Sequence, residues 1–292
     1  MQDNIVFFGA SSFGLNCLMG LKEISDLNIK GVVSAPRKFE ISYSPKGVDN
    51  VLHTDFSSYC KDSNIPFYEI KSMKGSMSDS DLYNKLNDWE PDYFIVVGWY
   101  HMITKKIRHM APAFGLHASL LPNYSGGAPL VWSLINDENK AGISFFQLMD
   151  GVDNGPIVGQ KSTDILETDD ISTLYRRIEG LGVSLLAENL PGLLLRKENF
   201  VIQDEINRVI YPQRSPDDGE INWDLNSRQV WNFVRAQTHP YPGAFSYFNT
   251  KKIHILSGKY YQDEGRDYKP GHVVSKDFDS AKIQWGMGFL KS

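Results

Sequence analysis

Residues 4–14 read Asn4-Ile5-Val6-Phe7-Phe8-Gly9-Ala10-Ser11-Ser12-Phe13-Gly14, an apolar run that ends at a glycine-containing turn. The run predicts a buried strand, and the apolar residues after the turn recur at helical spacing. The loop lacks the complete glycine fingerprint of dinucleotide-binding proteins, and no P-loop lysine follows it. We therefore interpret the segment as a strand, a turn and a helix rather than as a phosphate cradle.

The same alternation continues along the first two hundred residues. Further strands are expected at residues 29–33, 92–98, 143–149 and 157–160, and helices at residues 56–63, 81–88 and from 169 onward. Strands that alternate with helices at this spacing imply parallel crossovers. The prediction is an α/β fold, with a Rossmann-like, mostly parallel sheet covered by helices on both faces. The stretch from Ala35 to Val51, which contains Pro, Ser and Gly, is expected to be a long surface loop.

From Arg214 onward the character of the sequence changes. Short alternating segments, such as residues 252–257 and 272–275, predict strands. We expect a large domain over residues 1–203 and a small β-rich domain over residues 204–292. The aromatic side chains of the second part are expected to form its own core rather than a dimer contact, with a homodimer left open; they are Trp231, Phe233, Tyr241 and Phe245.

Composition limits the functional class. The 292 residues are 41% hydrophobic, enough for a sizeable core. No basic region precedes an apolar run at Met1–Asn4, and no stretch approaches the roughly 18 apolar residues of a membrane helix, so neither a membrane nor export is expected. The two cysteines, Cys17 and Cys60, cannot supply a disulfide framework or a cysteine-rich zinc site. The expectation is a cytoplasmic protein without a metal.

The charge balance argues against a polyanionic partner. The net charge is −5, and residues 204–292 carry twelve Lys and Arg against eleven Asp and Glu. A nucleic-acid-binding protein more often has a basic face or domain. Transfer RNA is therefore a disfavoured partner, although charge alone does not exclude it.

Two segments carry the candidate chemistry. The first is His117-Ala118-Ser119-Leu120-Leu121-Pro122, followed by Gly126-Gly127-Ala128-Pro129, and the second is Asp150-Gly151-Val152-Asp153-Asn154-Gly155-Pro156. Histidine titrates near neutral pH and can donate and recover a proton, whereas most histidines merely cap turns. The long, specific context separates His117 from the other six. Asp153 lies in a common type of turn, which by itself predicts no function. The turn follows a strand that is expected to be buried, however, and ligand sites of α/β sheets lie at the carboxyl ends of strands.

These segments resemble those of the transferases that use 10-formyltetrahydrofolate, which act on methionyl-tRNA, glycinamide ribonucleotide or amino sugars. The resemblance covers nearly the whole chain. It implies a catalytic domain over residues 1–203 and a C-terminal, OB-like domain over residues 204–292. It also implies that 10-formyltetrahydrofolate donates a formyl group to an amine, with His117 stabilising the oxyanion and protonating the leaving nitrogen while Asp153 orients His117 or a water and collects protons.

The resemblance further implies a pterin pocket of apolar side chains with backbone polar groups at the edge of the ring. For Trp99 and Tyr100, ordinary core packing is the alternative. The residues expected to bind the folate are Gly98, Tyr100, Met102, Ile103, Ser119, Leu120, Leu121, Pro122, Met149, Asp150, Gly151 and Val152.

One position departs from the family pattern, because Gly115 stands where these enzymes usually have an asparagine that donates to the oxyanion. Loss of one such donor costs on the order of 10²–10³ in rate in another enzyme class. Either a backbone N–H or the amide of Asn123 or Asn154 replaces it, or the enzyme is slow, or the protein only binds folate or a nucleotide sugar. We favour replacement.

The acceptor amine is expected to belong to a nucleotide-linked amino deoxysugar. The charge balance, a C-terminal part somewhat short for reading tRNA, and Ser125 where the tRNA enzymes usually have arginine all favour a sugar. Methionyl-tRNA is the alternative acceptor. A hydrolase that releases formate is a further one, since water could take the place of the amine.

Overall fold

Strands and helices alternate along the chain, whose computed structural model describes residues 2–22, 24, 27–41, 44–71, 77, 79–197, 199–206, 208–261, 269–276, 281–285 and 288–291. The elements are, in chain order, β1 (Asp3–Phe8), α1 (Ser12–Lys22), β2 (Leu27–Ser34), β3 (Lys38–Ile41), β4 (Ser44–Asp49), α2 (Ser57–Asp62), β5 (Phe67–Glu69), α3 (Ser80–Trp89), β6 (Tyr93–Val96), α4 (Lys105–Arg108), β7 (Ala113–His117), β8 (Ser125–Gly126), α5 (Pro129–Ile135), β9 (Lys140–Gln147), β10 (Ile157–Asp164), α6 (Ile171–Leu194), β11 (Ile210–Tyr211), the 3-10 helix η1 (Pro216–Gly219), α7 (Ser227–Arg235), β12 (Ala244–Phe248), β13 (Lys251–Ile255), β14 (Lys259–Tyr261), β15 (Val273–Lys276), β16 (Ala281–Trp285) and β17 (Gly288–Lys291).

The chain divides into two compact units. The first unit comprises Met1–Ser125, Gly142–Ser162 and Ile178–Val209. The second unit comprises Gly126–Ala141, Thr163–Arg177 and Ile210–Ser292. In the described part of the chain, no helix is long and apolar enough to cross a membrane.

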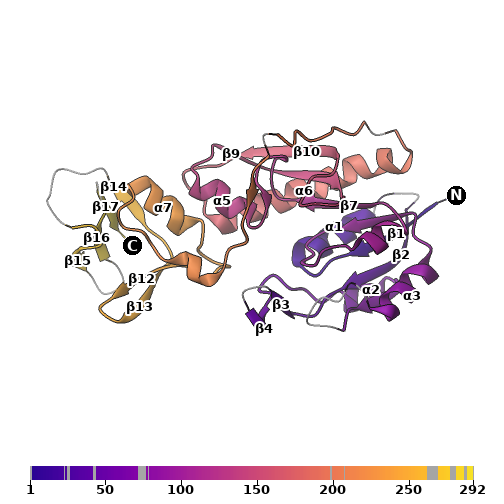
Figure 1. The fold of residues 1–292 in the computed structure, drawn as a ribbon, viewed down its shortest axis with the longest axis horizontal. Helices are drawn as coiled ribbons and strands as arrows, with labels where there is room; N and C mark the ends of the chain where they lie inside the picture. The colour runs from indigo at the N-terminus through magenta and orange to yellow at the C-terminus, as the bar shows by residue number, and fades with distance from the viewer. Residues whose placement is uncertain are drawn as a thin grey trace. The chain divides into compact units, whose positions relative to one another are not determined.

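A seven-stranded sheet, in the order β10-β9-β7-β6-β1-β2-β5, organises the N-terminal portion of the chain (Figure 1). β1 pairs in parallel with β2 and β6, and the β2–β5 and β6–β7 pairs are also parallel, whereas β7 and β9 are antiparallel. The expected mostly parallel α/β sheet is confirmed. Strand order reverses between β1 and β6, and ligands of open α/β sheets bind beyond the carboxyl ends of the strands at such a reversal.

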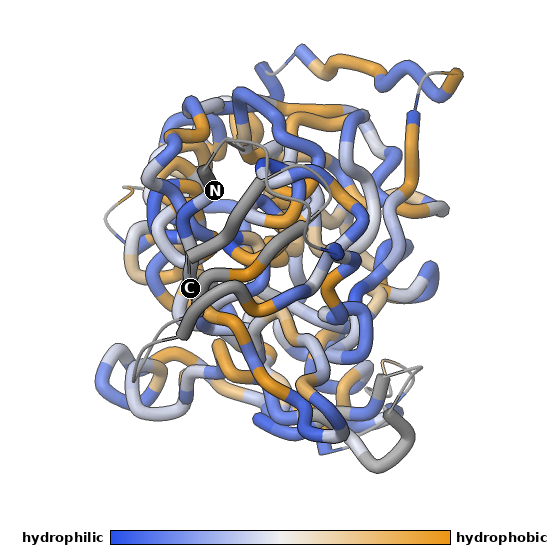
Figure 2. Tube along the Cα trace, turned by 90° about the vertical axis from the view of Figure 1, so that its left-hand side faces the viewer, coloured by the Kyte–Doolittle hydropathy of each residue, from blue (hydrophilic) through white to orange (hydrophobic). Residues whose placement is uncertain are grey.

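The core of the first unit explains the apolar runs in the sequence. The side chains from Ile5 to Phe8 in β1 are fully buried, as expected for a strand covered on both faces. Helix α3 packs beside them through Leu82, Leu86 and Trp89. Gly31 of β2 is required here, because a Cβ atom at that position would lie 2.4 Å from the Trp89 ring. Figure 2 shows hydrophobic and hydrophilic stretches alternating along the trace, as apolar elements joined by polar loops require.

The expected long loop from Ala35 to Val51 is wrong in part, because it contains the antiparallel pair β3–β4. Lys38 pairs with Asp49, and Ile41 pairs with Ser44. Pro, Ser and Gly around these residues indicate a loop, but they also suit the ends of a short ribbon. Residues 42 and 43 of this segment lie outside the described residues.

The second unit has its own apolar core, built from α7 and the C-terminal strands (Figure 1). Ile221, Val230, Trp231 and Val234 are buried there, and Phe233 packs against them. Helix α7 begins with a reciprocal hydrogen-bonded cap between Asn226 and Gln229, which satisfies backbone N–H groups of its first turn. The small β-rich C-terminal part predicted from the sequence is confirmed.

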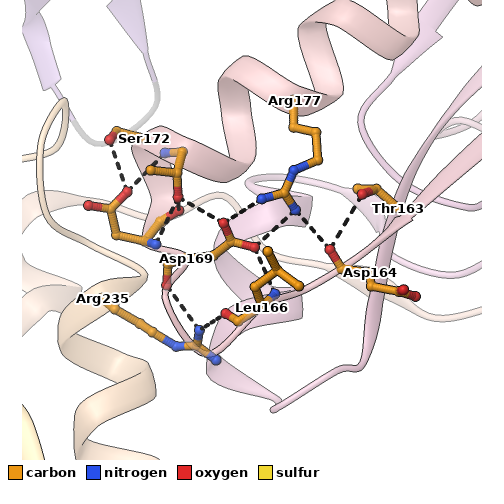
Figure 3. A network of polar contacts seen from close by, with 9 residues as sticks. Thr163, Asp164, Leu166, Asp169, Ser172, Arg177 and Arg235 are labelled. Carbon is orange, nitrogen blue, oxygen red and sulfur yellow. Dashed lines mark hydrogen bonds and ion pairs between the residues drawn. The ribbon is translucent and has the colours of Figure 1, made fainter.

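A polar network in the second unit ties the loop before α6 to α7 (Figure 3). The guanidinium of Arg177 donates to both carboxylate oxygens of Asp169, at 2.6 and 3.0 Å. Arg235 donates to the backbone oxygens of Leu166 and Asp169, at 3.0 and 2.9 Å. Burial raises the pKa of the Asp169 carboxyl, but hydrogen bonds from Arg177, the Leu166 amide and Thr173 outweigh burial and leave it below its ordinary value.

Replacing Asp169 with Asn should therefore lower the free energy of unfolding near pH 7 by about 1–3 kcal/mol, because hydrogen bonds to a charged group are lost. Since the folded-state pKa is depressed, the stabilisation is complete above the ordinary carboxyl pKa and is lost as the pH falls through the folded-state value. Urea unfolding measured from about pH 7 down to about pH 3 should show the difference between wild type and Asp169→Asn shrinking. A difference that stays constant over this range would contradict the assignment.

Candidate active site

His117 ends β7, where it pairs with Ser144 of β9. Its side chain is 13% exposed, and its Nε2 atom lies 2.9 Å from the backbone oxygen of Tyr124. A carbonyl oxygen only accepts hydrogen bonds, so Nε2 carries the hydrogen in this contact. The other ring nitrogen, Nδ1, is therefore the one available for proton exchange.

Asp153 lies in the loop between β9 and β10, which we name the Asp153 loop (residues 148–156). Its Oδ2 atom is 3.7 Å from Nδ1 of His117, and its side chain is 23% exposed. The reason for expecting Asp153 at the active edge of the sheet was wrong, because β9 runs antiparallel to β7 and the rule for parallel strands does not apply to it. The loop nonetheless brings the carboxylate to the ring.

The pair is suited to acid–base chemistry. The separation of 3.7 Å is an ion-pair distance and exceeds that of a hydrogen bond. Catalytic hydrogen bonds are often long without substrate and tighten once it binds. When Nδ1 is protonated, the Asp153 carboxylate stabilises the positive ring, and when the ring is neutral, Nδ1 presents a lone pair.

Buried hydrogen bonds hold the segment after His117 in place. The Ser144 hydroxyl, fully buried in β9, donates to the backbone oxygen of Ser119 at 2.6 Å and accepts from the Leu121 amide at 3.1 Å. Nε2 of Gln160 donates to that hydroxyl at 2.8 Å and to the Leu121 oxygen at 2.9 Å. Sequence reasoning missed both residues. A serine inside an otherwise apolar strand was the available signal, since buried polar groups need partners.

The Asp153 loop has a strained backbone at one residue and packs closely against the end of β9 at another. Asp153 adopts φ of 49°, in the left-handed region that non-glycine residues rarely enter. A Cβ atom on Gly155 would lie 1.7 Å from the backbone oxygen of Gln147, so only glycine fits there. The Arg108 guanidinium pairs with Asp150, and Lys105 lies 3.5 Å from the same carboxylate. The Arg108 hydrogen bond, together with the positive charges of Lys105 and Arg108, outweighs the effect of burial and lowers the pKa of Asp150.

The residues expected to bind folate divide by exposure. Tyr100, Met102, Met149 and Val152 expose 40, 69, 47 and 38% of their surface, so their apolar side chains are available to a ligand. Asp150 and Gly151 are also exposed, and Gly98, Leu120 and Pro122 are half-buried. Three side chains face the interior and could offer a ligand only backbone atoms, namely those of Ile103, Ser119 and Leu121. The folate-binding role of all twelve stays a prediction.

The space beside Gly115 is occupied. A Cβ atom there would lie 3.1 Å from the Val96 oxygen and 3.3 Å from Cδ2 of Leu148. Gly115 also pairs with Val96 and Phe146 inside the sheet, away from the end of β7. Asn154 folds back over Gly151, where its Nδ2 lies 2.8 Å from the position of an added Cβ. The structure thus gives Leu148 as the side chain beside Gly115, and a substitute donor stays a prediction.

Other candidate groups have structural explanations. The turn after β1 uses the N–H groups of Gly9, Ala10 and Ser12 to bond backbone oxygens, which argues against a phosphate cradle. Burial raises the pKa of the Cys60 thiol to about 11 and also raises that of Cys17, so neither is a thiolate at neutral pH. In the part of the chain that the structure describes, no group of three His, Cys, Asp or Glu side chains is placed to hold a metal ion.

Comparison with known sequences identifies the family. The sequence model described as "Formyl transferase" matches residues 4–190, and "Formyl transferase, C-terminal domain" matches residues 214–291. The methionyl-tRNA formyltransferase of Thermodesulfovibrio yellowstonii is 32% identical over 261 residues, covering 88% of this chain and 80% of the relative. That of Lactococcus lactis subsp. lactis is 28% identical over 296 residues, covering 99% and 89%. The chain belongs to the formyl transferase family, and the expected class of transferase is confirmed.

A solved structure shares the fold. WlaRD, described as a sugar 3N-formyl transferase and crystallised with dTDP and 5-N-formyl-THF, aligns with a TM-score of 0.70 and 18% identity. The alignment covers 100% of this chain and 98% of WlaRD. At this identity the likeness establishes the fold alone.

The Ser144→Ala variant tests the hydrogen bonds that hold the His117 segment. Removing the hydroxyl leaves the Leu121 N–H and the Ser119 oxygen without this partner, which should lower the free energy of unfolding by about 1–3 kcal/mol. Urea unfolding at neutral pH measures the loss. Ser133→Ala is the control, because that buried hydroxyl donates to the backbone oxygen of Pro129, one helical turn earlier, at 3.0 Å and has no other hydrogen bond recorded among the described residues. Equal effects of the two variants would refute a special role for Ser144.

Proposed function

We propose that this protein transfers a formyl group from 10-formyltetrahydrofolate to a primary amine, with His117 and Asp153 as the catalytic pair. The observation that carries the proposal is the 3.7 Å approach of Asp153 Oδ2 to His117 Nδ1 in a chain of the formyl transferase family. WlaRD was crystallised with a formyl-folate, which supports a folate donor for the related fold.

The exposed apolar side chains after β6 and in the Asp153 loop suit a flat heteroaromatic ring. Tyr100 and Met102 follow β6, and Met149 and Val152 lie in the Asp153 loop. Such a ring gains from contact with apolar groups that water would otherwise cover. When bound, 10-formyltetrahydrofolate supplies the formyl carbon. The residues of this chain then have to orient the acceptor amine, stabilise negative charge and move protons.

His117 and Asp153 divide those tasks. In the transfer, a bond forms between the amine nitrogen and the formyl carbon, and the bond from that carbon to the donor nitrogen breaks. Asp153 accepts the proton that the amine loses. Protonated Nδ1 stabilises the negative charge that develops on the formyl oxygen and then delivers its proton to the departing nitrogen. Asp153 then passes the proton that it took from the amine to Nδ1 of His117, which restores both groups and conserves protons over one turnover.

For the acceptor we propose the amine of a nucleotide-linked amino deoxysugar. The net charge of −5 and the even balance of charge in residues 204–292 favour a small anionic substrate over a long polyanion. WlaRD, with which the chain shares its fold along its whole length, is a sugar 3N-formyl transferase.

Methionyl-tRNA is the second candidate acceptor, and a specific observation favours it. The sequence relatives reported above are methionyl-tRNA formyltransferases, and each aligns with more than four fifths of this chain. Four expectations stay predictions under either acceptor. They are the OB-like character of residues 204–292, the domain boundary at residue 204, a cytoplasmic location and a homodimer.

The Asp153→Asn variant tests the catalytic pair. The amide keeps the shape of the side chain but cannot accept a proton, so kcat should fall by about 10²–10⁴-fold with little change in KM for the folate. Steady-state assays of tetrahydrofolate release measure both. Asp164→Asn, on the edge strand β10, is the control. If Asp153→Asn retains more than about a third of the activity, the proposed role is refuted.

An acceptor panel separates the candidate functions. Purified protein, 10-formyltetrahydrofolate and either nucleotide-linked 3-amino and 4-amino deoxysugars or methionyl-tRNA should give a formamide only with a sugar. Transfer to methionyl-tRNA, with salt-sensitive retention of the tRNA, would establish the second candidate instead. Formate release without an acceptor would indicate a hydrolase. Binding of folate or nucleotide sugar without any turnover would identify a binding protein.

A further inference from the structure

A buried glutamine outside the two sequence motifs contacts the Asp153 loop. Gln203, in the segment that follows α6, is 6% exposed. Its Nε2 atom donates to the backbone oxygen of Asp153 at 2.8 Å and to that of Gly155 at 2.7 Å. Both acceptors are carbonyls, so the amide group has to present its nitrogen to them. One side chain thereby bridges the turn that carries the candidate catalytic carboxylate.

The segment that carries Gln203 is itself anchored to the sheet. Val201 and Ile157, the first residue of β10, exchange two backbone hydrogen bonds of 2.9 and 2.8 Å. The Phe200 ring stacks on that of Phe114 in β7, with centroids 6.2 Å apart and an interplanar angle of 16°. Gln203 therefore extends from a fixed backbone, and its hydrogen bonds transmit the position of the sheet to the Asp153 loop.

A second side chain of the same segment adds to this connection. Arg208 donates to the backbone oxygen of Val152 and pairs with Glu205 through Nε, at 3.1 Å. Its side chain is 12% exposed. Residues 152, 153 and 155 thus each have a backbone oxygen bonded to a side chain of this segment. Support of this kind suits Asp153, whose φ of 49° persists only where surrounding structure determines it.

We infer that Gln203 is a positioning residue, which fixes the backbone of the Asp153 loop so that the carboxylate of Asp153 faces Nδ1 of His117. This inference rests on the proposed function for its catalytic meaning. Gln203 acts through two carbonyl groups and does not itself touch the reacting atoms. Its Oε1 atom is buried and has no hydrogen-bond partner among the described residues, so the described hydrogen bonds of this amide are those to the loop.

Two variants test the inference, Gln203→Met and Gln203→Glu. Methionine keeps the length of the side chain but loses both donors, so kcat should fall on the order of 10-fold to 100-fold while KM for the folate changes less than about threefold. In Gln203→Glu the ionised carboxylate faces two carbonyl oxygens and repels them, whereas the protonated acid donates one hydrogen bond. Its kcat, relative to that of wild type, should therefore rise as the pH is lowered.

The matched control is Gln237→Met in the second unit. Gln237 is 7% exposed; its Nε2 donates to the Phe233 oxygen at 3.0 Å, and its Oε1 accepts from Arg214 at 2.7 Å. The substitution and the burial are alike, but these hydrogen bonds lie outside the Asp153 loop. We expect this variant to lose stability without a specific loss of kcat, when both variants are assayed well below their unfolding temperatures.

Hydrogen–deuterium exchange of peptides that cover residues 148–156 supplies a readout independent of activity. Gln203→Met should exchange these amides at least about tenfold faster than wild type, and Gln237→Met should not. If wild type transfers formyl groups and Gln203→Met keeps kcat within about twofold, the inference fails and the proposed function stands. If wild type formylates no acceptor, the proposed function fails, and the exchange experiment alone decides whether Gln203 positions the loop.

Discussion

The contact on which the site depends is that between His117 Nδ1 and Asp153 Oδ2, because each group reaches it from a different part of the sheet. His117 is placed by β7, and its following segment is fixed by the Ser144 hydroxyl and Gln160. Asp153 comes from a loop that follows an antiparallel strand and is held by side chains near the end of the first unit. Neither support lies in residues 117–122, 126–129 or 150–156, the segments that carry the candidate chemistry. The geometry of the pair is therefore a property of the whole sheet and its connector.

Much of the fold followed from the sequence, because strong local patterns agreed with the tertiary structure. The run from Ile5 to Phe8 has no polar alternation, which is typical of a strand buried on both faces, and it lies inside a parallel sheet. The direction of β9 could not be obtained in this way, since a strand's own side chains are the same whether its neighbour is parallel or antiparallel. The β3–β4 pair was missed because turn-forming residues outnumber the strand signal in such short elements.

The site was predictable in part for a similar reason. His117 and Asp153 stand in long, specific segments of consecutive residues, whereas the supporting contacts join residues 16 to 56 positions apart. Nothing near Gln203 in the sequence connects it with Asp153, and the bridge between Val201 and Ile157 brings the two segments together only in the folded chain. The local sequence also does not reveal that the side chains of Leu121 and Ser119 are buried, because burial depends on how a segment packs against the rest of the sheet.

The hydrogen bond between His117 Nε2 and the Tyr124 oxygen determines which nitrogen of the ring is open to an inhibitor. A main-chain oxygen never gives up a hydrogen, so one end of the imidazole is committed before any reactant arrives. A proton can then enter or leave the ring only at Nδ1, so a single nitrogen has to serve for both transfers. A small molecule that bound at Nδ1 would block proton transfer without moving the ring. One that bound at Nε2 would first have to break the hydrogen bond to the Tyr124 oxygen.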